Sequence, residues 1–131
     1  MGMTTLQLDG NDFSILLSFY SEVGKVFTKD LGWEIGRNLD AFNDVLRGGF
    51  GVYDCEEPIQ LIWLHSDKSR MDLGWEETLK YLTKKLKTCH PTNVEAVKRD
   101  LAMAQSYVGK TLFELIVEII KTHNHIELML R

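Results

Sequence analysis

Two spacings of apolar residues divide the chain into predicted strands and helices. Residues 4–8 alternate in the manner of a strand, residues 59–64 are almost continuously apolar, and residues 126–130 again have a strand pattern. Elsewhere apolar residues recur every three or four positions, which is the spacing of a helix with one buried side. This helical pattern covers residues 13–28, 39–47, 66–90, 92–108 and 111–122, with a break at His90-Pro91.

The order of these elements predicts an α/β fold. A strand, two helices, a second strand, several helices and a third strand follow one another. Helical crossovers between strands favour parallel pairing within one sheet. The apolar run at 59–64 is expected to be the central strand or its neighbour, covered on both faces. A length of 131 residues is enough for one domain with its own core.

Residues 33–51, WEIGRNLDAFNDVLRGGFG, carry the densest set of local signals. Asn38 is a favourable N-cap, because its side-chain oxygen can accept an N–H that the first helical turn leaves unpaired. Gly48 and Gly49 provide a left-handed helix end, so a helix is expected at 39–47. One side of this helix is apolar and must pack against the core; its residues are Leu39, Phe42, Val45 and Leu46.

Asp40 and Asp44 lie one turn apart on the other side of the same helix. Like charges at this spacing destabilise a helix by about 0.2–0.5 kcal/mol. Arg37 lies three residues before Asp40, and Arg47 lies three after Asp44. One interpretation is therefore a solvated face with partly compensated charges. The other is an anionic docking surface for a cationic partner, held on a rigid element beside a glycine-rich loop.

Residues 36–48, GRNLDAFNDVLRG, resemble the binding helix of the barstar family, the small protein inhibitors of secreted bacterial ribonucleases of the barnase type. The family pattern is Gly-x-Asn-Leu-Asp-Ala, an apolar residue, and then x-Asp-x-Leu-x-Gly, which this chain follows without a gap. The resemblance implies a three-stranded parallel sheet packed with helices. It also implies a bacterial immunity protein of a toxin–antitoxin pair, which binds a cognate secreted ribonuclease and is not an enzyme.

In the family, the acidic helix and the preceding loop block the ribonuclease active site with carboxylates in place of RNA phosphates. Carried over, Asp44 is the principal phosphate mimic and Asp40 is its neighbour. Asn43 and Gly49 stand where the family can have aromatic contacts, which leaves open a non-inhibitory scaffold that serves as an interaction or adaptor module. The implied partner-binding residues are Glu34, Gly36, Asn38, Asp40, Asn43, Asp44, Arg47, Gly48, Gly49 and Glu118.

We expect the similarity to cover residues 6–64 and 111–131. Residues 66–110 are longer than the same part of a minimal family member, so we interpret them as a helical insertion within a single domain, 1–131. We expect this insertion on the side of the sheet away from the acidic helix. It has a basic edge that is most simply a solvated helix face, with a nucleic-acid contact as the alternative; the edge is formed by Lys80, Lys84, Lys85 and Lys87.

The net charge of −4 is unevenly distributed. Residues 1–65 hold ten acids and four Lys or Arg, whereas residues 66–131 hold nine acids and eleven bases. An acidic N-terminal half argues against binding of nucleic acid and for steering toward a basic protein. No apolar run approaches the length of a membrane span, and the first residues lack the pattern of a signal peptide. We therefore expect a cytoplasmic protein without membrane contact.

Other residues that often carry chemistry give no strong signal. Cys55 and Cys89 are expected to be free thiols, because nothing else suggests an oxidising compartment. His123 and His125 have the alternate spacing of two ligands on a strand, but no cysteine or acid stands at ligand spacing, so a polar turn is the simpler interpretation. Cys89 and His90 are adjacent and rarely could face each other as nucleophile and base. No metal and no cofactor is predicted.

Overall fold

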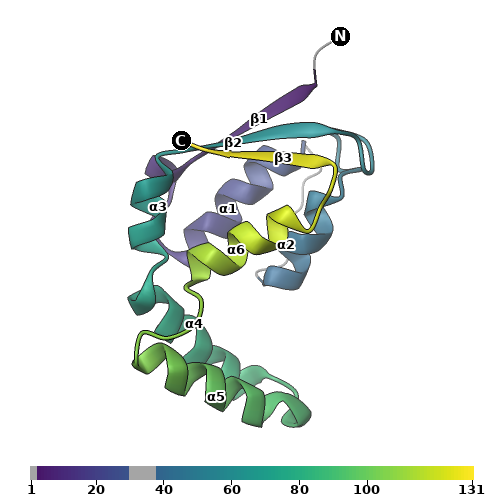
Figure 1. Ribbon diagram of the computed structural model, residues 1–131. Coiled ribbons are helices and arrows are strands. Elements are labelled where there is room, and N and C mark those ends of the chain that lie inside the picture. The colour runs from purple at the N-terminus through teal and green to yellow at the C-terminus, as the bar shows by residue number, and fades with distance from the viewer. Residues whose placement is uncertain (1–2, 30–37) are drawn as a thin grey trace.

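The computed structural model describes residues 3–29 and 38–131, which form a three-stranded sheet with helices against it (Figure 1). None of the described helices has both the length and the apolar character needed to cross a membrane. In chain order the elements are β1 Thr4–Asp9, the 3-10 turn η1 Gly10–Asp12, α1 Leu16–Phe27, α2 Leu39–Leu46, β2 Ile59–Leu64, α3 Ser66–Asp72, α4 Trp75–Thr88, the 3-10 turn η2 Pro91–Asn93, α5 Val94–Gln105, α6 Leu112–Lys121 and β3 Ile126–Leu130.

All strands of the sheet are parallel and are arranged in the order β1-β2-β3, which confirms the predicted α/β fold. Leu6, Leu61 and Leu128 stand side by side in the register and belong to the row that packs against the helices. β2 is the central strand, as its apolar sequence predicted. Because β2 lies between β1 and β3, the inward side chains of all three strands form one continuous floor for the core.

The expectation that β2 is covered on both faces is wrong. Its inward residues Ile59, Leu61 and Trp63 are buried, whereas its outward residues are only half-buried. The helices α1, α2 and α6 lie on the inward side, and no helix of the described chain covers the other side (Figure 1). Ile62 is apolar and points to the open face, where it is partly shielded by its neighbours in the register, Gln7 and Met129.

Aromatic rings form the centre of the core between the sheet and the helices. Phe42 of α2 packs edge-on against Phe19 of α1, with ring centroids 5.3 Å apart. Phe19 stacks on Trp63 of β2 at 5.9 Å, and Trp63 contacts Phe113 of α6 at 5.1 Å. Such ring pairs add to the free energy of simple apolar burial. α2 is thereby joined to the sheet and to α6 through one continuous cluster.

Two helices differ in extent from the predicted ones, each for a local reason. α1 begins at Leu16 rather than residue 13, because the Asp9 side chain accepts the Asn11 N–H and turns the chain into η1. The helix expected at 66–90 is divided into α3 and α4 at Gly74, whose backbone is extended. A glycine at this point weakens the helical pattern that the apolar spacing suggests.

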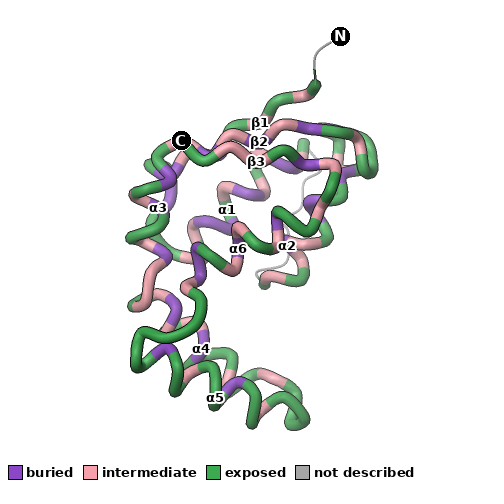
Figure 2. Tube along the Cα trace, viewed as in Figure 1, coloured by how far each residue is buried: buried purple, intermediate pink, exposed green. Residues whose placement is uncertain are grey.

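α4 and α5 form a hairpin that projects beyond the core and is largely exposed (Figures 1 and 2). The expectation that this segment lies away from the acidic helix is wrong, since α4 borders a groove shared with α1 and α2. Hydrogen bonds from distant residues fix this placement. The Leu112 N–H at the start of α6 donates to Thr78 Oγ1 at 2.8 Å, and the Leu16 N–H at the start of α1 donates to Glu77 Oε2 at 2.7 Å.

Candidate functional site

α2 presents an apolar side to the core and a charged side to solvent. Phe42, Val45 and Leu46 are at most 1% exposed, whereas Asp40 and Asp44 are exposed, as the pattern predicted. The helix has only 8 residues, and isolated helices of this length are not stable in water. Its position therefore depends on groups at its ends and on its flank.

Both ends of α2 carry the capping residues that the sequence predicted. The Asn38 side-chain oxygen accepts the Ala41 N–H at 2.7 Å. Gly48 is buried with a φ of 94°, and a Cβ there would lie 2.6 Å from the Asp54 carbonyl oxygen. Gly49 has a φ of 88° but is exposed, with open space around an added Cβ. Gly48 thus closes the helix against the next loop, while Gly49 belongs to the exposed surface.

Three residues that sequence reasoning did not assign to this site hold α2 in place. The Tyr53 hydroxyl donates to the Leu46 carbonyl oxygen at 2.8 Å, and His125 Nε2 donates to the same oxygen at 3.0 Å. His123 Nε2 donates to Asn43 Oδ1 at 2.7 Å. The bonds to Leu46 satisfy a carbonyl group that the end of a helix leaves unpaired. The alternate spacing of the two histidines was a visible signal, but we interpreted it as a polar turn, with metal binding as the alternative.

The electrostatic environment of His123 favours a neutral ring. Partial removal from water lowers its pKa from the ordinary value of 6.5, and the neighbouring His125 and Arg47 act in the same direction, while Glu56 opposes them. The rings of His123 and His125 are 5.7 Å apart. Protonation of His123 would therefore place a second positive charge beside Arg47, on the flank of α2.

Asp40 and Asp44 are not neutralised by the described part of the chain. Neither carboxylate forms an ion pair there, and Arg47 does not pair with Asp44. Arg37 lies outside the described residues. Asp44 also stands in the last turn of the helix, where the helix dipole disfavours a negative charge. Within the described residues, the negative charges of these two carboxylates are therefore left unpaired on a rigid element.

The other residues implied by the resemblance have different surroundings. Asn43 is half-buried, and its side-chain oxygen is used by His123. Glu118 is exposed on α6, which packs against α2, and its carboxylate is paired with Lys110. Glu34 and Gly36 lie outside the described residues. The implied residues that the structure brings together on α2 or directly beside it are Asn38, Asp40, Asn43, Asp44, Arg47, Gly48 and Gly49.

The residues weighed for metal binding or catalysis have other partners. Within residues 3–29 and 38–131, no group of three His, Cys, Asp or Glu side chains is placed to hold a metal ion. Cys55 and Cys89 are free. His90 contacts the Thr92 hydroxyl at 2.8 Å, and the Cys89 thiol points to a backbone oxygen of α4. These contacts give the adjacent Cys89 and His90 separate structural roles.

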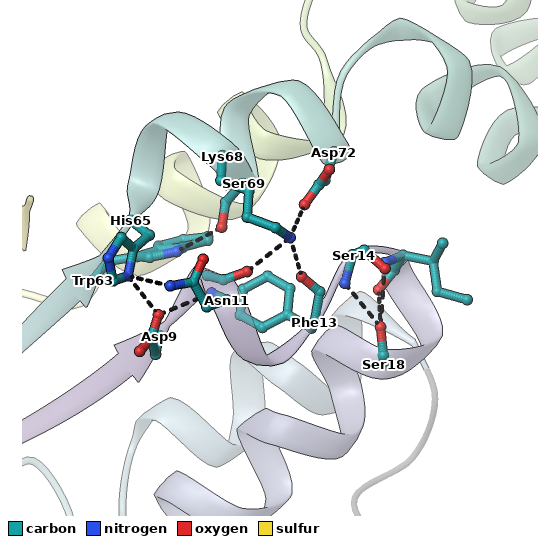
Figure 3. Close-up of polar contacts among 12 residues, drawn as sticks. Asp9, Asn11, Phe13, Ser14, Ser18, Trp63, His65, Lys68, Ser69 and Asp72 are labelled. Carbon is teal, nitrogen blue, oxygen red and sulfur yellow. Dashed lines mark hydrogen bonds and ion pairs between the residues drawn. The ribbon is translucent and has the colours of Figure 1, made fainter.

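A second polar cluster joins the carboxyl ends of β1 and β2 (Figure 3). His65 Nδ1 lies 2.8 Å from Asp9 Oδ1 and 3.1 Å from Asn11 Nδ2. Lys68 donates to two backbone carbonyl oxygens after β1 and pairs with Asp72. The Asn11 N–H and then the His65 ring hold the pKa of Asp9 below its usual range. Parallel sheets often bind ligands at this edge, but here the polar groups bond to one another and connect the strand ends to α3.

These features define a class: an α/β protein whose short acidic helix is fixed on one side of a parallel sheet. A family model described as Barstar (barnase inhibitor) matches residues 3–106, and the chain belongs to this family, whose members are inhibitors rather than enzymes. The match runs through α3, α4 and α5 and ends before α6, a different span from the expected 6–64 and 111–131. That residues 66–110 are an insertion in a single domain stays a prediction. No curated protein and no solved structure gives a significant match.

Proposed function

We propose that this chain is an immunity protein that inhibits a cognate secreted ribonuclease by covering its active site with α2 and the loop before it. The observation that carries the proposal is the pair of exposed carboxylates, Asp40 and Asp44, on a fixed helix in a chain of the barstar family. A ribonuclease presents cationic groups to RNA phosphates. Carboxylates that are already in position can satisfy those groups without the entropy loss of ordering a flexible segment.

The residues around the two acids take different parts in this proposal. Asp44 is the principal phosphate mimic, and Asp40 extends the negative charge along the same face. Asn38, Gly48 and Gly49 shape the ends of that face, while Asn43 and Arg47 lie at its border. The resemblance adds Glu34 and Gly36 from the preceding loop and Glu118 from α6.

Glu118 contributes only if its ion pair opens. Its carboxylate is held by Lys110 in the free protein, so a cationic group of the ribonuclease would have to replace that lysine. Exposed ion pairs of this kind are weak, with a median near 0–1 kcal/mol, and such a replacement is energetically accessible. The proposed compartment is the bacterial cytoplasm, where the ribonuclease would be held inactive before secretion.

The test is inhibition of ribonuclease activity by the purified chain, measured against barnase and against ribonucleases encoded beside this chain's gene. The wild type is compared with Asp40→Ala, Asp44→Ala and the double variant. Asp100→Ala on α5 is the matched control, because it removes an exposed acid from the projecting hairpin. We expect association to slow as salt is raised, since steering between opposite charges is screened.

Asp44→Ala should raise the inhibition constant by roughly 30-fold or more, which corresponds to about 2 kcal/mol. This magnitude is that of interface hot spots, of which the barnase–barstar pair is an established example. Asp100→Ala should behave as wild type. If no ribonuclease is inhibited, the adaptor function becomes the better hypothesis, because Asn43 and Glu118 are already engaged within the chain.

A further inference from the structure

A groove of about 530 Å³ lies between α1, α2 and α4. Its walls come from three separate stretches of the chain, which converge because Glu77 of α4 accepts the first N–H of α1. The groove is open to solvent along one side, and its volume lies within the range of about 300–1,000 Å³ that is usual for binding pockets. It exists only because the α4–α5 hairpin lies on the same side of the sheet as α2.

The floor of the groove is apolar and incompletely covered. Leu16, Tyr20, Leu39 and Tyr81 line it, and Leu17 of α1 is 49% exposed at its edge. Tyr20 is only 5% exposed, and its hydroxyl has no hydrogen-bond partner among the described residues. Burial first, and then the neighbouring Tyr81 and Asp40, raise the pKa of Tyr20. Apolar surface and an unpaired hydroxyl donor therefore lie together beneath the groove.

The α4 edge of the groove is positively charged. Lys80, Lys84 and Lys85 line this edge with one acid, Glu77, whose carboxylate accepts the Leu16 N–H, so the net charge of the edge is positive. Lys80 is loosely paired with Glu76 at 3.8 Å, and Lys85 lies 5.6 Å from the centroid of the Tyr81 ring. Lys84 has no ion-pair partner among the described residues. An occupant that complements this edge carries a negative charge beside an apolar group.

The groove is continuous with the acidic face of α2. Asn38, Leu39 and Asp40 belong to its lining, so the first turn of α2 lies between the acidic face of this helix and the lysine edge of α4. Asp40 belongs both to the acidic face and to the groove. If the basic cleft of a partner covers Asp40 and Asp44, the surface at the edge of that cleft therefore lies over the groove. The alternation of sign along the surface selects against partners that are uniformly basic.

We propose that the groove is a second contact for the ribonuclease, which receives an apolar side chain flanked by a carboxylate from the margin of the enzyme's active site. This inference rests on the proposed function and extends it to specificity. The acidic helix supplies the contact that any ribonuclease of the class would accept. The groove supplies a contact that only an enzyme with the matching acidic and apolar margin can make.

The test uses matched pairs of variants in the full chain, with a barnase-type ribonuclease that the wild type inhibits. Leu17→Ser is paired with Ile15→Ser, because Ile15 is 47% exposed on the same segment but outside the groove. Lys84→Glu is compared with Lys87→Glu, which changes the charge equally on the same helix but outside the groove. Circular dichroism and thermal unfolding check that each variant is folded.

We expect each groove variant to raise the inhibition constant at least about fivefold, mainly through faster dissociation, while each control stays within about twofold of wild type. If Asp44→Ala weakens inhibition but the groove variants behave like their controls, the groove proposal is overturned and the proposed function stands. If no ribonuclease is inhibited by the wild type, both fail. The lysine variants keep the test decisive should Leu17→Ser fold poorly.

Discussion

Asp44 occupies the last turn of α2, one turn after Asp40, and both carboxylates face solvent without an ion pair in the described chain. Each of these facts is unfavourable for the isolated protein, because like charges repel at this spacing and the helix dipole disfavours an acid at this end. Other single residues around α2 act in the opposite sense. Tyr53, His123 and His125 each form a hydrogen bond that holds the helix in position.

Asp44→Asn should stabilise the free protein by about 0.5 kcal/mol and, under the proposed function, weaken inhibition. The substitution keeps the shape of the side chain and removes only its charge, so the repulsion with Asp40 disappears. Urea unfolding at neutral pH measures the effect. Asp67→Asn is the control, because Asp67 stands in the first turn of α3, where an acid is favourable and its loss should cost a few tenths of a kcal/mol. Equal loss of stability in both variants would contradict this account of Asp44.

His123 should make stability dependent on pH below about 6.5. Its folded-state pKa is lowered, so the unfolded chain takes up the proton first as the pH falls. The contribution of the neutral ring is complete above the unfolded pKa and is lost as the pH falls through the folded one. Thermal unfolding is measured between about pH 5 and about pH 8, on both sides of the ordinary histidine pKa of about 6.5. The melting temperature should fall more steeply with decreasing pH for the wild type than for His123→Gln.

Glutamine at this position keeps an N–H donor for Asn43 but does not titrate. His90→Gln is the matched control, since His90 lies at the turn between α4 and α5 and contacts Thr92. It should leave the pH profile of the wild type unchanged. Identical profiles for the wild type and both variants would show that His123 does not carry the effect.

At the scale of elements, α2 shows which structural features can be predicted from a sequence and which cannot. Asn38 and Gly48 could be recognised, because a cap depends on residues within one turn and on backbone conformations that few residues adopt. The contact from His123 to Asn43 joins residues 80 positions apart, and nothing local distinguishes such a histidine from a metal ligand. The placement of α4 was missed for the same reason, since it depends on Thr78 meeting the start of α6.

The two glycines after α2 should respond differently to alanine. Both have a positive φ, which disfavours any side chain by about 1–2 kcal/mol. At Gly48 the added Cβ would also lie 2.7 Å from the Tyr53 ring, whereas at Gly49 it would meet nothing within 4 Å. Gly49→Ala should therefore destabilise by about 1 kcal/mol and Gly48→Ala by more than about 2 kcal/mol. Chemical unfolding ranks them, and a reversed order would contradict the proposed helix closure.

At the scale of the whole molecule, the helices crowd onto one face of the sheet, and the other face has no helical cover in the described chain (Figure 1). The apolar sequence of β2 suggested that both of its faces are covered. Its outward residues can be apolar without a second layer of helices, because the neighbouring strands on either side partly shield them. The sequence could therefore predict the class of fold and the central strand. It could not predict which side of the sheet the hairpin of α4 and α5 would take.

Leu61 and Leu64 allow a direct test of this one-sided arrangement, because the same residue type points to opposite faces of β2. Leu61 is fully buried against the helices, whereas Leu64 is half-buried on the open face. Leu61→Ala should destabilise by about 2–5 kcal/mol and Leu64→Ala by about 1 kcal/mol or less. Thermal unfolding of the two variants provides the comparison. Losses of equal size would indicate a second covered face.

The fastening of α2 by His123 and His125 also has a consequence for timing. A ribosome makes the chain from its N-terminus, so α2 emerges while the residues that hold its flank have still to be added. β3 comes later still, and it completes the sheet on which α6 and α2 rest. Domains generally fold as units once their sequence is available. A nascent chain would thus carry the acidic residues without the finished surface, and under the proposed function only completed molecules would inhibit a ribonuclease.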